Sequence, residues 1–139
     1  MRDPSKLDKI VIATLSFFAA LLPRAVSLGT FLTADEALWL QRSRSFVEAV
    51  WRHDWAGTYV TAHPGVTTAW LSGLSLLVLR PQGVSGNLLA AAFPIALTSS
   101  VGVLLIYWLS SEIFDRRIAL AAALLVAFDP FYIAHSRVV

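Results

Sequence analysis

The chain has 139 residues, of which 57% are hydrophobic and only 14% are charged, and its mean hydropathy of +0.67 is typical of proteins embedded in lipid rather than of soluble domains. The net charge of +2 comes from scattered acidic and basic residues without a basic block, so binding to nucleic acid is not indicated. The absence of cysteine excludes disulfides, thiolate metal sites and thiol chemistry.

The first apolar run of the chain predicts a transmembrane helix over about residues 10–28, interrupted only by Arg24. Its length exceeds the apolar core of a signal peptide and reaches the ~20 residues that a span requires. Arg2, Lys6 and Lys9 precede the run and place the N-terminus in the cytoplasm by the positive-inside rule. The residues after this helix are therefore expected outside.

The next segment, residues 35–55, predicts a helix lying along the membrane surface. Thr33 and Glu36 have the spacing of a capping box at its start. Apolar residues recur at helical spacing on one face, and the opposite face is strongly charged, as in interfacial helices. Aromatic residues that suit an interfacial belt follow the same segment: Trp39, Trp51, Trp55 and Tyr59.

A short apolar stretch, Val66 to Leu79, follows the break at His63-Pro64-Gly65. Fewer than ~17 residues is short for a span, so we expect a second interfacial or partly re-entrant helix, with a tilted transmembrane helix as the alternative. A loop rich in glycine and serine is expected over residues 81–87.

The uncharged residues 88–109 predict a second transmembrane helix. Arg116 and Arg117 lie in the turn that follows and indicate a cytoplasmic loop, so residues 29–87 would form one external loop.

A third transmembrane helix is expected over about residues 118–136, with a break at Asp129-Pro130. It would return the chain to the external side. The expected fold class is therefore all-α integral membrane protein, with about three transmembrane helices and amphipathic interfacial helices in the first external loop.

Asp35 and Glu36 are the first candidate site residues. Acidic residues at the start of a helix commonly cap it and interact with its dipole. Here they follow a membrane span, where adjacent carboxylates also suit proton abstraction or cation binding beside a lipid-borne substrate. The residues alone leave both interpretations open.

Three further residues are candidates for binding a substrate. His63 is more simply a solvated loop histidine, although it could contact a phosphate or serve as one metal ligand. His135 and Arg137 lie near the end of an apolar helix, where ionisable groups are costly and usually have a reason, although an arginine there can also snorkel. Motifs of soluble nucleotide-binding proteins and hydrolases are absent.

These features occur in an order that resembles a known family: a span, Thr33-Ala34-Asp35-Glu36, an aromatic helix, His63-Pro64-Gly65, and the ending from Ala127 to Arg137. The order is similar to the N-terminal part of polyprenyl-phosphate-sugar-dependent glycosyltransferases of the GT-C class. This class includes protein O-mannosyltransferases and lipid A aminoarabinose transferases. The resemblance covers nearly the whole chain, and it implies a fragment of a multi-pass cell-membrane enzyme that is inactive alone.

The resemblance also implies a reaction. Members of this family move a sugar, with inversion, from an isoprenoid phosphate carrier to a lipid, glycan or protein acceptor on the extracytoplasmic side. Carried onto this chain, the catalytic base is Asp35, with Glu36 as its neighbour, and Arg137 is a cation for the departing phosphate. His63 and His135 are further expected substrate contacts.

Two points stay open at this stage. No cofactor is indicated, but a divalent cation could take part. The alternative from another functional class is a non-catalytic transporter or scaffold segment, in which Asp35 and Glu36 only cap a helix and Arg137 only anchors one.

Overall fold

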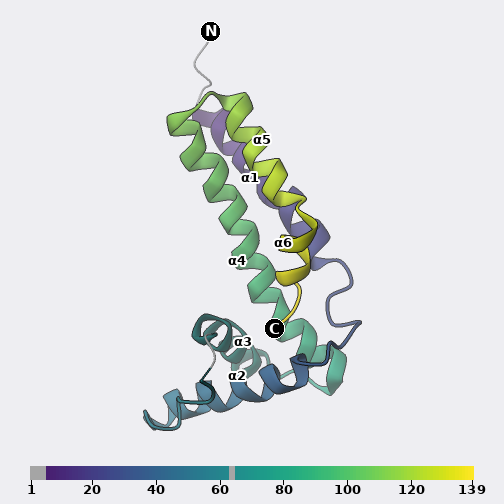
Figure 1. Ribbon diagram of the computed structural model, residues 1–139, viewed down its shortest axis with the longest axis vertical. Coiled ribbons are helices and arrows are strands. Elements are labelled where there is room, and N and C mark those ends of the chain that lie inside the picture. The colour runs from purple at the N-terminus through teal and green to yellow at the C-terminus, as the bar shows by residue number, and fades with distance from the viewer. Residues whose placement is uncertain (1–5, 63–64) are drawn as a thin grey trace. The chain divides into compact units, whose positions relative to one another are not determined.

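Every regular element of the computed structural model, which describes residues 6–62 and 65–139, is an α-helix. The all-α fold class expected from the sequence is therefore confirmed. The helices are α1 (Lys6–Ala25), α2 (Glu36–Trp51), α3 (Val66–Leu79), α4 (Gly83–Ile113), α5 (Arg116–Ala127) and α6 (Pro130–His135) (Figure 1).

The chain divides into two units, and α4 contributes to both. Unit 1 consists of Met1–Val26 and Ala96–His135, and unit 2 consists of Ser27–Ile95 and Ser136–Val139.

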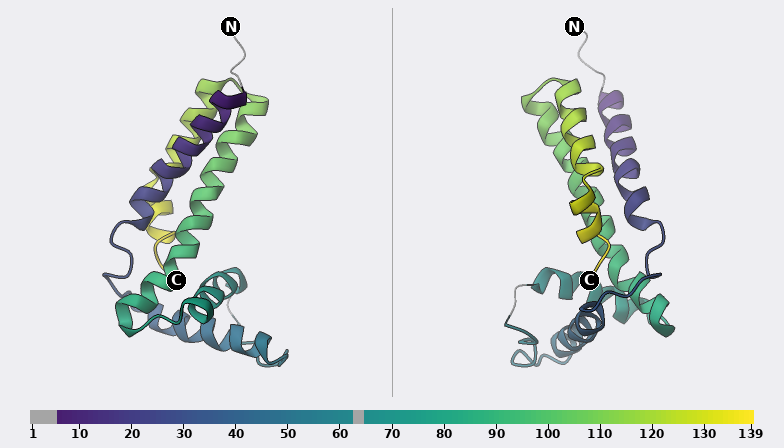
Figure 2. Two further views of the ribbon diagram at one scale, coloured as in Figure 1. Left: turned by 180° about the vertical axis from the view of Figure 1, so that it is seen from behind. Right: turned by 45° about the vertical axis from the view of Figure 1, so that its right-hand side comes forward.

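Unit 1 is a helical bundle that packs through small residues. Figure 2 shows α1, α5 and the adjoining part of α4 running side by side. On α5, Ala119, Ala123 and Ala127 recur at every fourth position and are fully buried. They form one core with Ala13 and Ala20 of α1. Small residues at this spacing let helix backbones approach closely, which is how helices associate in membranes.

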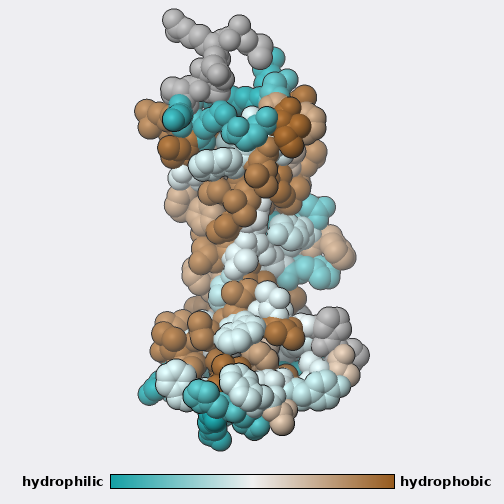
Figure 3. All heavy atoms as spheres, turned by 90° about the vertical axis from the view of Figure 1, so that its left-hand side faces the viewer, coloured by the Kyte–Doolittle hydropathy of each residue, from teal (hydrophilic) through white to brown (hydrophobic). Residues whose placement is uncertain are grey.

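The large apolar side chains of unit 1 lie on its outside. On α1, Leu15, Phe18 and Leu22 are each more than half exposed. Brown, hydrophobic residues accordingly cover much of the flank in the upper part of Figure 3. Apart from Val103 and Tyr107, the buried residues of this core are alanines. Mainly small residues inside and large apolar residues outside are expected of a bundle whose solvent is lipid.

Among the described helices, α4 is the one long and apolar enough to cross a membrane. It has 31 residues and contains the whole predicted span 88–109. The first predicted span corresponds to α1, which has charged residues near both ends, and the third is divided between α5 and α6. The number of spans stays a prediction.

The division between α5 and α6 lies at the break expected from the sequence. Pro130 lacks an N–H group and occupies the first position of α6, where none is needed. Asp129 accepts a hydrogen bond from the backbone N–H of Tyr132 at 2.6 Å through Oδ1 and so caps α6. This contact assigns the Asp129 carboxylate to a structural role.

In unit 2, α2 and α3 pack directly against each other. Gly73 of α3 lies against the carbonyl oxygen of Ser43, and its absent side chain makes this close approach of the two backbones feasible. Phe46 and Trp70 add an edge-to-face contact with 5.3 Å between ring centroids. The helix predicted over Val66 to Leu79 is confirmed with the same bounds.

Two serines of α3 attach it to the first part of α4. The hydroxyl of Ser72 donates to the carbonyl oxygen of Ala91 at 2.8 Å, and that of Ser75 donates to Ala90 at 2.6 Å. Interhelical hydrogen bonds of this kind supplement packing where water is absent.

Two segments of unit 2 differ from the sequence prediction. The surface helix ends at Trp51 rather than near residue 55, because His53 adopts a left-handed φ of 58° and the chain turns. The prediction of a loop over residues 81–87 is wrong from Gly83 onward, because α4 begins at Gly83. The side-chain amide of Asn87 donates to the carbonyl oxygen of Gly83 at 2.7 Å. The last residues of the expected external loop, 29–87, are therefore helical.

The contact at Gly73 predicts the effect of adding one methyl group. A Cβ at this position would clash with the Ser43 carbonyl oxygen and lie 3.1 Å from Cβ of Val47. Gly73→Ala should therefore destabilise the α2–α3 pair by roughly 1–3 kcal/mol, measured as a lower Tm in detergent. In Gly86→Ala the added Cβ would lie at an ordinary 3.5 Å from Pro81, so this control should keep or raise Tm. Equal Tm values for the two variants would contradict the packing described.

Candidate functional site

The two adjacent acids at the start of α2 have different surroundings. Glu36 is only 2% exposed, and its Oε2 accepts a hydrogen bond from the backbone N–H of Thr33 at 2.7 Å. This bond is one half of the predicted capping box. Asp35 is exposed and makes no side-chain capping bond to the described residues. The carboxylate of Glu36 is thus engaged in the fold, and that of Asp35 is open to a ligand.

The polar face of α2 lines a groove made of two adjoining pockets of about 420 and 290 Å³. Both pockets are lined by Arg44, Glu48 and Asn87, and we call their union the α2 groove. One pocket reaches Arg80, and the other reaches Ala37, the residue after Glu36. The groove therefore runs along α2 as far as its second residue, and neither Asp35 nor Glu36 lines it.

Arg44 and Arg80 give the α2 groove its cationic character. Nη2 of Arg44 donates to Oδ1 of Asn87 at 2.5 Å, which fixes that arginine against α4. Arg80 follows α3 in a left-handed conformation, with φ of 45° and ψ of 51°. A residue with a Cβ pays roughly 1–2 kcal/mol to adopt this conformation, which glycine adopts freely. This conformation ends α3, and the backbone N–H of Arg80 donates to the carbonyl oxygen of Leu76 at 3.1 Å.

Of the remaining sequence candidates, Arg137 lies in the same unit as Asp35 and Glu36. Val139, two residues further on, packs against the cluster of Leu76, Ala90 and Ala91 in unit 2.

His135 belongs to unit 1 and is exposed at the end of α6. Its ring lies against that of Phe131, with 4.0 Å between centroids, and its Nδ1 is 3.0 Å from the Phe131 carbonyl oxygen. His63 lies outside the described residues. Its neighbour Gly65 contacts the ring of Trp39, because a Cβ on that glycine would lie 2.5 Å from Cη2.

Arg24 is a buried residue whose partners the sequence could not indicate. It is 0% exposed, and its Nη1 donates to the carbonyl oxygens of Ala20 and Ala127, both at 2.8 Å. Its Nη2 donates to the carbonyl oxygen of Val126 at 3.3 Å, and its guanidinium lies 4.9 Å from the centre of the Tyr132 ring. Arg24 thus joins the C-terminal ends of α1 and α5, where helix dipoles favour a cation.

Comparison with known proteins gave a match to a protein family. A family model described as dolichyl-phosphate-mannose-protein mannosyltransferase matches residues 62–139, which is more than half of the chain. The matched region includes Arg80, Asn87, His135 and Arg137, and it begins after Asp35. No curated protein and no solved structure matched.

The contacts of Arg24 predict that its loss separates α1 from α5. Arg24→Met keeps a long side chain but leaves the carbonyl oxygens of Val126 and Ala127 without this donor. We expect a loss of about 3 kcal/mol in stability, seen as a lower Tm in detergent. Leu22→Met, at an exposed position of the same helix, is the control and should change Tm little. An unchanged Tm for Arg24→Met would show that the bonds do not hold the two helices together.

Proposed function

The chain belongs to the GT-C glycosyltransferase family of the dolichyl-phosphate-mannose-protein mannosyltransferases, and from this premise we propose that Asp35 is the general base of its sugar transfer. The chain is thus part of a membrane glycosyltransferase of mannosyltransferase type. In the proposed reaction the donor is a polyprenyl-phosphate sugar, and the acceptor hydroxyl lies on the extracytoplasmic side.

The observation that carries this proposal is the difference between Asp35 and Glu36. A general base must reach the proton that it removes, and the exposed Asp35 carboxylate is free of capping bonds to the described residues. Glu36 holds the backbone of Thr33 and so fixes the start of α2 from which Asp35 projects. In this proposal Asp35 is the catalytic residue, and Glu36 is a positioning residue.

The proposed chemistry is a single displacement at the anomeric carbon of the sugar. The bond from this carbon to the phosphate oxygen breaks while the bond to the acceptor oxygen forms. The acceptor proton passes to Asp35, and the phosphate leaves with the electron pair. The protein must therefore supply a base on one side and stabilise an anion on the other.

We assign the departing phosphate to the cationic end of the α2 groove. Arg44 and Arg80 provide two guanidinium groups there, and guanidinium matches the geometry of phosphate oxygens. Val47 and Leu76 line the same pocket and suit the first part of an isoprenoid chain. Arg137, His63 and His135 remain further proposed contacts, and Arg137 lies in the same unit as the groove.

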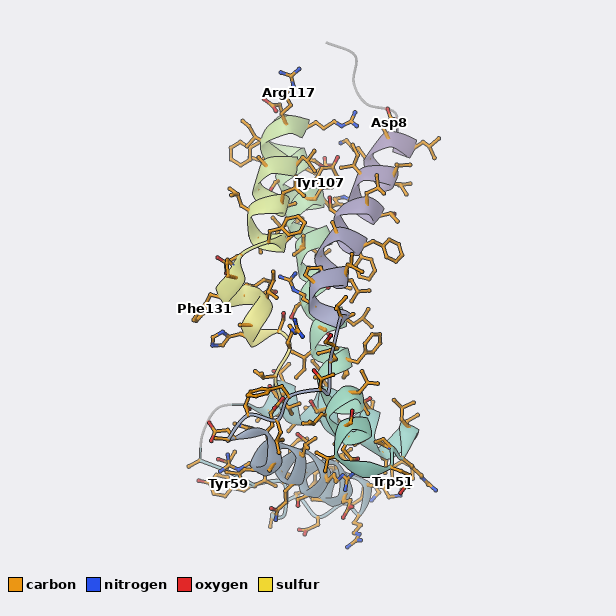
Figure 4. The ribbon with its side chains drawn as sticks, turned by 90° about the vertical axis from the view of Figure 1, so that its right-hand side faces the viewer. Asp8, Trp51, Tyr59, Tyr107, Arg117 and Phe131 are labelled. Carbon is orange, nitrogen blue, oxygen red and sulfur yellow. The ribbon has the colours of Figure 1, made fainter. Side chains whose placement is uncertain are left out.

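The orientation of the site follows from charge. Lys6 and Lys9 in the first part of α1, and Arg116 and Arg117 at the start of α5, favour the cytoplasmic side for these helix ends. The intervening external segment then contains α2 and α3. It carries exposed aromatic residues at Trp51, the last residue of α2, and at Tyr59 in the connection that follows (Figure 4). A multi-pass arrangement of about three spans, with Asp35 outside, remains our proposal.

Replacing Asp35 with its neutral isostere tests the base. Asp35→Asn in the full-length protein should lower kcat about 10²–10⁴-fold with normal membrane insertion, because the amide cannot accept the proton. Asp54→Asn is the matched control, since the side chain of this exposed aspartate of unit 2 accepts a hydrogen bond from Gly57 N–H, which asparagine can also do, and makes no other within the described ranges. A transporter or scaffold segment would show normal function in both variants.

Glu36 tests the division of roles between the two acids. Glu36→Gln keeps an oxygen that accepts the Thr33 N–H, so it should retain kcat within about threefold, whereas Glu36→Ala should lose about 1–2 kcal/mol of stability. Turnover and Tm of the two variants check this. A loss of kcat in Glu36→Gln as large as that in Asp35→Asn would mean that Glu36 acts in the chemistry.

Arg80 should combine a gain in stability with a loss of donor binding. Arg80→Gly relaxes the left-handed backbone and should stabilise the protein by about 1 kcal/mol, but it should raise the donor KM roughly tenfold. His53→Gly is the control, because His53 has a similar φ of 58° and does not line the α2 groove. It should raise Tm without changing KM. If both variants leave KM unchanged, the phosphate does not bind at Arg80.

A further inference from the structure

We propose that unit 1 binds the headgroup of an anionic phospholipid in a pocket between the start of α1 and the end of α4. The pocket has a volume of about 450 Å³. Its lining combines basic and hydroxyl-bearing side chains, which suit a phosphate, with apolar side chains, which suit acyl chains. We call it the α1–α4 pocket. It is lined by Lys6, Lys9, Ile10, Tyr107, Trp108, Ser111 and Glu112. This site is independent of sugar transfer and uses none of the residues assigned to it.

The first argument is the hydroxyl of Tyr107. Tyr107 is only 1% exposed and belongs to the core of unit 1, and Figure 4 shows it between the helices. Within the described part of the chain its hydroxyl has no hydrogen-bond partner. Buried tyrosine hydroxyls nearly always have one, since an unpaired polar group in an apolar setting is costly. Tyr107 also lines the pocket, and in this proposal its hydroxyl turns toward the pocket and donates to an oxygen of the bound phosphate.

The second argument is the charge of the pocket. Lys9 pairs with Glu112 at 3.3 Å, and both side chains remain partly exposed. Lys6 is exposed and has no carboxylate partner among the described residues. A single phosphate can accept hydrogen bonds from both ammonium groups, whereas Glu112 neutralises only one of them. The pocket therefore has an excess of positive charge.

The third argument is that the ligand is amphiphilic. Ile10 and Trp108 border the pocket and are 53% and 52% exposed, so apolar and aromatic surface adjoins the lysines. Trp108 suits the boundary between headgroups and acyl chains. Figure 4 shows Asp8 and Arg117 at this same end of unit 1, the end that its basic residues assign to the cytoplasmic leaflet, where anionic lipids are concentrated.

The experiment compares the full-length protein in nanodiscs of phosphatidylcholine and in nanodiscs that also contain phosphatidylglycerol. A ligand that binds the folded state raises Tm, so the anionic lipid should raise Tm of the parent protein. Inorganic phosphate added to phosphatidylcholine nanodiscs should not. If inorganic phosphate stabilises equally, the pocket takes a free anion, and the assignment to a lipid is overturned.

Tyr107→Phe is the decisive variant because it changes no charge. In a non-ionic detergent without phospholipid it should be at least as stable as the parent, since it removes an unpaired hydroxyl. Its affinity for phosphatidylglycerol should fall roughly tenfold, the effect of one lost hydrogen bond to a charged group. Equal stabilisation of the parent and Tyr107→Phe by phosphatidylglycerol would overturn the proposal.

Lys6→Gln and Arg117→Gln form a matched pair that separates a site from diffuse attraction. Each removes one positive charge from the same end of unit 1, but only Lys6 lines the pocket. Lys6→Gln should weaken binding of phosphatidylglycerol roughly tenfold, and Arg117→Gln less than about threefold. Equal losses in the two variants would show general attraction to an anionic surface and would contradict a defined site.

Discussion

Helices in lipid gain little from burying apolar side chains against one another, and this constraint explains how both units are built. In unit 1 the alanines of α5 bring the backbones of the bundle close together, and the large apolar residues remain outside. In unit 2, Gly73 lets the backbone of α3 lie close to the Ser43 carbonyl oxygen of α2. Two serines of α3 also donate hydrogen bonds to carbonyl oxygens of α4. Close backbone approach, rather than bulk hydrophobicity, is what orders these helices.

The same constraint limits where polar groups can be placed. Arg24 is fully buried but bonds to carbonyl oxygens at the ends of two helices. Glu36 is buried but bonds to a backbone N–H group, and Asp129 caps α6. Arg24, Glu36 and Asp129 are therefore engaged in holding the fold. The charged groups of unit 2 that remain open to a ligand include Asp35 and the arginines of the α2 groove. A base and a cationic pocket are the two parts that transfer from a phosphate carrier requires.

Much of the fold could be predicted from the sequence, because apolar length and periodicity report helices directly. The bounds of α3, the break at Asp129-Pro130 and the uncharged segment within α4 were predicted in this way. The extension of α4 back to Gly83 was missed, since a run rich in glycine and serine has weak helix propensity and is helical here through its contacts.

The candidate site was less predictable. The sequence placed Asp35 and Glu36 together, but it could not show that the Glu36 carboxylate is buried and hydrogen-bonded while that of Asp35 is exposed. Arg24 finds its partners 102 and 103 residues away, which no local pattern reports. The left-handed backbone of Arg80 is likewise invisible in a sequence where arginine simply follows an apolar helix.

The most direct test of the account measures two quantities on one preparation of the full-length Asp35→Asn protein: the affinity for the polyprenyl-phosphate sugar and the rate of a single turnover. A residue that acts only as the base should leave the affinity within about twofold of the parent and slow the single turnover by about 10² or more. If the affinity falls in parallel with the rate, Asp35 binds the donor. If neither changes, the open carboxylate at the start of α2 is not part of the reaction.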